Sequence, residues 1–150
     1  MVLQYGKMNS EFQRCLDNRK LTEFKPAADL IGKELRAAEY DILRARSSYD
    51  NKDPKWATIQ AYYSMFHAAR ALVFHKGYRE KSHRCLLVAL VELYVDRGEL
   101  AADITESFQE AMDMREHADY GFIYNDQTAQ KIIKNDDNFI KIARKLLKIK

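Results

Sequence analysis

Residues 54–77 read PKWATIQAYYSMFHAARALVFHKG, and their apolar side chains surround most of the circumference of a helix. Asp53 can cap this helix, Pro54 suits its first position, and Gly77 can take the left-handed conformation that ends it. A helix that is apolar on several sides packs against several neighbours. We therefore predict that this segment forms the central helix of a helical bundle.

Further helices are predicted on both sides of this segment from apolar residues spaced three and four apart. Each is expected to begin at a residue type that commonly starts helices: Ser10, Pro26, Ser82, residues 101–103 with Glu106 in a capping box, and Asp126. Because the connections between them are short, neighbouring helices should be antiparallel. The sequence predicts an all-α fold, an antiparallel up-and-down bundle of about five to six helices.

The composition suits one compact domain over residues 1–150, with residues 1–25 as an N-terminal extension and a short helix. With only 5 Gly and 2 Pro, the chain has too few turn residues for a protein built mainly of sheets. The formal charge of +3 does not by itself indicate a polyanionic partner. Either Met1 or Met8 could be the native start.

The two cysteines, Cys15 and Cys85, do not have the spacing of metal ligands. The first ten residues lack the apolar run of a signal peptide, and no apolar stretch is long enough to span a bilayer. We therefore expect reduced, buried thiols in a cytoplasmic protein that does not contact a membrane.

Residues 115–120 read REHADY and place a guanidinium, an imidazole, a carboxylate and a phenol at the end of the fifth predicted helix. The chain contains no glycine-rich phosphate loop and no nucleophile elbow. Its four histidines are separate rather than grouped, so we predict no metal and no cofactor. These observations leave the end of the fifth helix as the main candidate site.

Three parts of the sequence together resemble the HEPN family: the phrase AYYSMFHAARAL at residues 61–72, the KSH cap at residues 81–83, and the Arg-x-x-Ala-Asp-Tyr pattern at residues 115–120. The resemblance spans roughly residues 26–148 and is closest to a poorly characterised prokaryotic branch of that family. It implies a small all-helical homodimer, often encoded beside a minimal nucleotidyltransferase. Many such proteins are metal-independent RNases or toxins.

The resemblance also assigns roles to residues. Arg115 matches the family arginine that stabilises charge on an RNA phosphate, whereas Tyr120 occupies the position of the family histidine and its phenol is a poor base near neutral pH. His117 could replace that histidine, or Asp119 could act as the base while Tyr120 donates a hydrogen bond. Alternatively, Arg115 and Asp119 form a structural ion pair, since they lie four residues apart.

Two other groups of residues are weaker candidates for a site. Arg70 and His75 also have the family spacing, but they lie in the central apolar helix, where residues five apart point in different directions. A basic loop could contact the RNA backbone or could simply be solvated. Its candidate nucleic-acid-binding residues are Lys76, Arg79, Lys81, His83 and Arg84.

The sequence thus favours a HEPN-like protein of a toxin-antitoxin or defence system that acts as a metal-independent RNase or binds RNA or a nucleotide. The alternative is a non-catalytic binding partner of a minimal nucleotidyltransferase or another subunit. The 9 Tyr, 7 Phe and 1 Trp exceed what a small bundle can cover, and this favours a homodimer.

Overall fold

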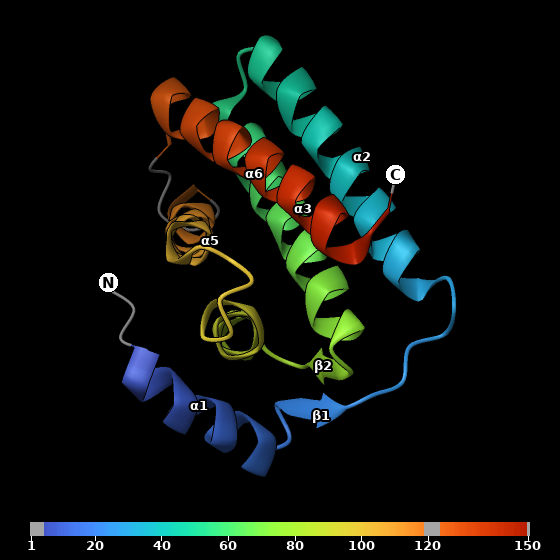
Figure 1. The fold of residues 1–150 in the computed structure, drawn as a ribbon. Coiled ribbons are helices and arrows are strands. Elements are labelled where there is room, and N and C mark those ends of the chain that lie inside the picture. The colour runs from blue at the N-terminus through green and yellow to red at the C-terminus, as the bar shows by residue number, and fades with distance from the viewer. Residues whose placement is uncertain (1–4, 119–123, 150) are drawn as a thin grey trace.

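The computed structural model describes residues 5–118 and 124–149 of the chain, and these residues fold into a helical bundle with one small sheet (Figure 1). The elements are α1 (Tyr5–Asp17), β1 (Leu21–Glu23), α2 (Leu30–Asp50), α3 (Pro54–His75), β2 (Tyr78–Glu80), α4 (His83–Leu90) with a π-helical continuation (Val91–Val95), α5 (Ala102–Glu116) and α6 (Asp126–Leu147). The all-α prediction is confirmed.

Helix α3 is the centre of the bundle, as its sequence predicts. Helices α2 and α6 run alongside it and contact each other, while α5 lies beside it and is viewed nearly end on in Figure 1. Tyr62, Leu72 and Phe74 of α3 are almost completely buried, together with Phe108 of α5. Burial of large apolar side chains is the main favourable contribution to folding.

The predicted ends of α3 and the start of α4 are confirmed. The Asp53 side chain accepts a hydrogen bond from the Trp56 N–H at 3.2 Å, and the chain leaves the helix through Gly77 with φ of +88°. The Ser82 side chain likewise accepts a hydrogen bond from the Cys85 N–H at 3.0 Å. These caps satisfy N–H groups that lack partners within the helix.

Three of the predicted helix starts are wrong. Helix α1 already begins at Tyr5, α2 begins at Leu30, and Asn125 rather than Asp126 caps α6, accepting from the Thr128 N–H at 2.8 Å. Helix α5 begins at Ala102, within the predicted residues 101–103, but no side chain caps it. Pro26 lies in the irregular segment between β1 and α2, in which the Phe24 N–H donates to the Gly77 carbonyl at 2.8 Å. After Pro26, the Leu30 N–H donates to the Ala27 carbonyl at 3.1 Å, so a turn precedes the first residue of α2.

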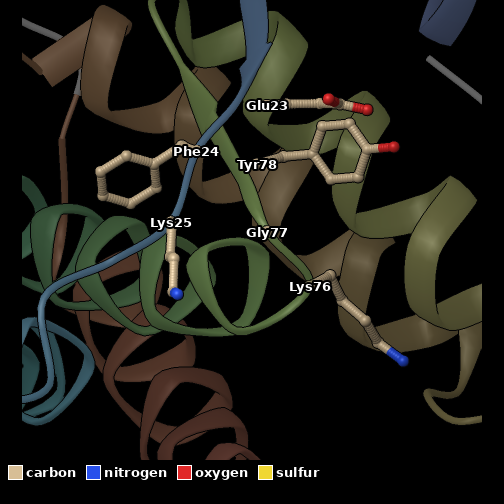
Figure 2. Close-up of a pocket in the computed structure, with 6 residues that line it drawn as sticks. All are labelled: Glu23, Phe24, Lys25, Lys76, Gly77 and Tyr78. Atoms are coloured by element: carbon tan, nitrogen blue, oxygen red, sulfur yellow. The ribbon is translucent and has the colours of Figure 1, made fainter.

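The two strands form an antiparallel pair that the sequence did not predict. Leu21 lies opposite Glu80, and Glu23 lies opposite Tyr78. Figure 2 shows the Glu23 and Tyr78 side chains on the same side of the ribbon, as expected for residues opposite each other. The pair joins the segment after α1 to the segment before α4 and so positions the first turn of α4.

The expectation of free thiols is also wrong. Cys15 of α1 and Cys85 of α4 form a disulfide with a Cα–Cα distance of 5.9 Å. The two residues lie 70 positions apart in the sequence, and the fold brings their buried side chains together. Within residues 5–118 and 124–149, none of the helices combines the length and apolar character needed to cross a membrane.

Candidate functional site

Arg115, in the last turn of α5, packs against the aromatic face of α3. Its guanidinium carbon lies 5.1 Å from the ring centroid of Tyr62 and 6.0 Å from that of Tyr63. The Nε atom is buried and has no hydrogen-bond partner, and Arg115 forms no ion pair with any residue that the structure describes. Buried polar atoms normally have a partner, so an unpartnered donor on a cation is compatible with an absent anionic ligand.

His83, the first residue of α4, lies against the same aromatic surface. Its Nδ1 atom is 2.5 Å from the Tyr62 hydroxyl oxygen, and its ring centroid is 4.6 Å from that of Phe66. The Tyr62 and His83 rings are stacked at 5.8 Å. Tyr62 therefore contacts both a cation from α5 and an imidazole from α4. We call Tyr62, Tyr63, Phe66, His83 and Arg115 the Arg115 cluster.

Burial sets the charge states in the Arg115 cluster. It raises the pKa of the Tyr62 hydroxyl, although the positive charge of Arg115 opposes the change. Burial lowers the pKa of His83, and the nearby charge of Arg115 lowers it further. Tyr62 is therefore a neutral phenol near neutral pH, and the imidazole of His83 is mainly uncharged. Arg115 supplies the positive charge of the cluster.

The first turn of α4 is held in place from two sides. The Arg84 guanidinium donates to the Glu11 carboxylate of α1 at 2.7 and 3.0 Å and to the Gln109 side chain of α5 at 3.2 Å. The Cys15–Cys85 disulfide adds a covalent link to α1. These contacts fix the position of His83 relative to α5, the helix that carries Arg115.

The other residues predicted near Arg115 have different locations. The His117 side chain is exposed to solvent directly after α5, where the backbone continues as a π-helix. Asp119 and Tyr120 lie outside the described residues, so their predicted roles, including the Arg115–Asp119 ion pair, stay predictions. Within the described residues, the imidazole that shares aromatic contacts with Arg115 is that of His83 rather than that of His117.

The predicted basic loop does not form a single cluster. Lys76 donates to the Glu99 carboxylate at 3.0 Å and lies 4.8 Å from the Tyr94 ring centroid, while Arg79 lies 5.4 Å from that of Phe24. Lys81 is exposed, and Arg84 binds Glu11 as described above. In Figure 2, Lys76 extends from a groove that Phe24 and Tyr78 also line. Only His83 of the five candidates joins the Arg115 cluster.

Arg70 and His75, the second arginine–histidine pair with the family spacing, do not form an open site, because structural contacts occupy Arg70. Arg70 donates to Glu80 at 3.0 Å and to Glu34 at 3.2 Å, and its guanidinium carbon lies 4.9 Å from the Phe74 ring centroid. His75 is exposed. Because two carboxylates already neutralise Arg70, it is not an open cation site, which agrees with the preference for Arg115.

Tyr62, Tyr63 and Phe66 belong to the helix that the sequence predicts to be the apolar centre of the bundle, and their place in the site was not predicted. Tyr63 and Phe66 are only partly buried, whereas Tyr62 is fully buried. A signal was present, because Phe66 lies four residues after Tyr62 and three after Tyr63, and side chains at these spacings are neighbours on a helix surface. Among the described residues, no group of three or more His, Cys, Asp or Glu side chains could hold a metal ion.

Comparison with known families now identifies the fold. Residues 32–146 match the HEPN domain family, a span that covers most of the chain. The chain belongs to the HEPN family. A solved structure with a similar fold is that of TT1696 from Thermus thermophilus, which has a TM-score of 0.67 and 16% sequence identity over 78% of this chain and 98% of that chain. At this identity the similarity concerns the fold alone.

Curated relatives support the assignment to the HEPN family. A protein of Archaeoglobus fulgidus named UPF0332 protein is 31% identical over 77% of this chain and 94% of its own length. A protein of Methanocaldococcus jannaschii named putative toxin MJ0605 is 26% identical over 76% of this chain and 86% of its own length. Putative toxin MJ0142 of the same organism is 28% identical over 60% of this chain and 61% of its own length.

Proposed function

We propose that this HEPN protein is a toxin-type, metal-independent endoribonuclease that binds an RNA phosphate with Arg115. The observation that carries the proposal is the guanidinium held over Tyr62 and Tyr63 with its Nε unpartnered. Two relatives named putative toxin support the toxin class. A system of toxin and antitoxin or of defence would be the biological setting.

The chemistry needs few protein groups. When the 2′-hydroxyl of RNA attacks the adjacent phosphorus, negative charge grows on the phosphate oxygens, and a fixed guanidinium stabilises that charge. Tyr63 and Phe66 are partly exposed beside Arg115 and can stack with an unpaired base, a common mode of single-stranded RNA recognition. The proposed substrate is therefore single-stranded RNA.

An RNA cleavage assay in the presence of a chelator tests this function. The wild-type protein should cleave single-stranded RNA, and Arg115→Ala should lower the rate at least about 100-fold, the usual loss when one donor to a developing oxyanion is removed. Arg97→Ala is the matched control, because Arg97 is an exposed arginine in the loop after the π-helical segment. Equal rates for all three proteins, or no cleavage by the wild type, would contradict the proposal.

The second candidate function is non-catalytic binding to another protein chain. Tyr40 and Leu43 on α2 are each 60% exposed, although both are large and apolar or aromatic. Exposed apolar surface of this kind supports a protein contact, and we propose a homodimer through this face of α2. Binding of a minimal nucleotidyltransferase without RNA cleavage would favour the non-catalytic function, and co-purification with such an enzyme tests it.

A further inference from the structure

His83 has two properties that the proposed function does not yet use. It hydrogen-bonds to Tyr62 through Nδ1, and it shares the rings of Tyr62 and Tyr63 with Arg115. Its second ring nitrogen, Nε2, forms no hydrogen bond with any residue that the structure describes. An unpartnered imidazole nitrogen and an unpartnered guanidinium Nε therefore occur in the same cluster.

We propose that His83 and Arg115 together form a phosphate-binding site in which His83 takes up a proton when the anion binds. This inference rests on the proposed function, because it assigns a second ligand and a pH dependence to the same site. The chemical class of the ligand is a phosphate group or another tetrahedral oxyanion.

The hydrogen bond between the Tyr62 hydroxyl and Nδ1 determines the tautomer of His83, and therefore which ring nitrogen can donate a hydrogen bond to a ligand. Tyr62 is completely buried, and its hydroxyl has no other hydrogen-bond partner within the described residues. The phenol proton must therefore point at Nδ1, or it would be buried without an acceptor. In the neutral imidazole, Nε2 then carries the hydrogen and can donate to an anion.

The charges around His83 explain why proton uptake should follow anion binding. From α5, Arg115 disfavours the imidazolium, and burial acts in the same direction. From α3, Tyr62 is a neutral phenol, and Tyr63 packs edge-on against the imidazole. The nearby charge of Arg84 is paired with Glu11, and that of Glu80 is paired with Arg70. A bound dianion would offset the charge of Arg115. The imidazolium would then become more favourable, with Nδ1–H donating to the Tyr62 oxygen, and the attraction of the dianion would have to exceed the cost of leaving the phenol proton without its acceptor.

The experiment is an NMR titration of the four histidines in sodium sulfate and in sodium chloride of equal ionic strength. Sulfate is the probe because it stays a dianion across the pH range, so any proton taken up belongs to the protein. Exposed His75 and His117 and the Glu34-bound His67 are internal controls. His83→Gln assigns the resonance, and His75→Gln is its matched control.

We expect the His83 midpoint to lie below the ordinary value of a histidine in chloride and to rise in sulfate, while sulfate should not move the midpoints of the control histidines. Between the two His83 midpoints, sulfate affinity should increase up to about tenfold for each unit of pH decrease. Arg115→Ala should raise the His83 midpoint in chloride and remove the effect of sulfate. Tyr62→Phe, which keeps the ring, should change the tautomer reported by the imidazole nitrogen shifts.

A sulfate-independent His83 midpoint, or equal shifts of all four histidines, would overturn the inference. The RNA cleavage assay separates this result from a failure of the proposed function. Cleavage that depends on Arg115 but not on His83, with no sulfate effect, would refute the inference and leave the function standing. Proton-linked sulfate binding without RNA cleavage would support the inference and refute the nuclease proposal.

Discussion

Asp136 on α6 should make the protein less stable as the pH rises above 4. Its side chain is completely buried, and neither carboxylate oxygen has a hydrogen-bond partner within the described part of the chain. The neighbouring Ser64 hydroxyl instead donates to the Ala38 carbonyl at 2.7 Å. Burial raises the pKa of Asp136 well above its ordinary value, and nearby Asp137 adds to this effect.

The sign follows from proton binding. With a folded-state pKa above the unfolded value of about 3.9, Asp136 binds its proton more tightly in the folded protein. Its favourable contribution is complete below pH 4 and is lost as the pH rises towards the folded-state pKa. The loss is at most about 1.4 kcal/mol for each pH unit, which sets an upper limit of about 3 kcal/mol between pH 4 and pH 6.

Asp136→Asn removes this titration and nearly preserves the volume of the side chain. Urea unfolding at several pH values from 4 to 8 should show the variant gaining stability relative to the wild type as the pH increases. Asp50→Asn, at an exposed position near the end of α2, should not show this trend. Parallel stability curves for the wild type and Asp136→Asn would refute the reasoning.

Three further predictions concern stability and assembly. Cys15→Ser should lower the free energy of unfolding by about 4 kcal/mol, the chain-entropy value for a bridge across 70 residues, and dithiothreitol should weaken the wild type but not the variant. Arg70→Met should cost about 2–3 kcal/mol in urea unfolding because it leaves the buried Glu80 carboxylate unpaired and Glu34 with His67 alone, although partial exposure of Arg70 reduces the loss; an unchanged midpoint would contradict this. Leu43→Glu should convert a dimer to a monomer in sedimentation velocity, and identical sedimentation would exclude this face as the interface.

Local signals were sufficient for much of the fold. Asp53, Pro54 and Gly77 mark the ends of α3 through capping and backbone conformation, and Ser82 marks the start of α4. These preferences act within a few residues of the chain, so they can be read from sequence. The start of α2 could not be read in this way, because Pro26 is followed by a turn, closed by the Leu30–Ala27 hydrogen bond, and not directly by the helix.

Long-range contacts account for the remaining differences in the fold. Each strand has only three residues, too few for an alternating pattern, and each is stabilised by a partner distant in sequence. The same is true of Cys15 and Cys85, whose pairing depends on the docking of α1 against α4. Spacing alone did not show that their side chains would meet.

The candidate site was partly accessible from sequence. Arg115 was selected from the motif at the end of its helix, and the structure leaves its Nε unpartnered. His83 was assigned to a separate basic loop because its contact with Tyr62 is tertiary. The aromatic residues of α3 suggested a core by their periodicity, and their second role as the surface under Arg115 required the position of α5.

The salt dependence of RNA binding tests the central claim, that Arg115 engages a phosphate, most directly. Fluorescence anisotropy with single-stranded RNA should show that Arg115→Ala weakens binding and reduces the slope of log affinity against log salt by about 0.7, the value for one lost phosphate contact. Arg97→Ala should retain the wild-type slope. If Arg115→Ala and Arg97→Ala bind RNA with the same affinity and slope as the wild type, Arg115 does not contact the phosphate.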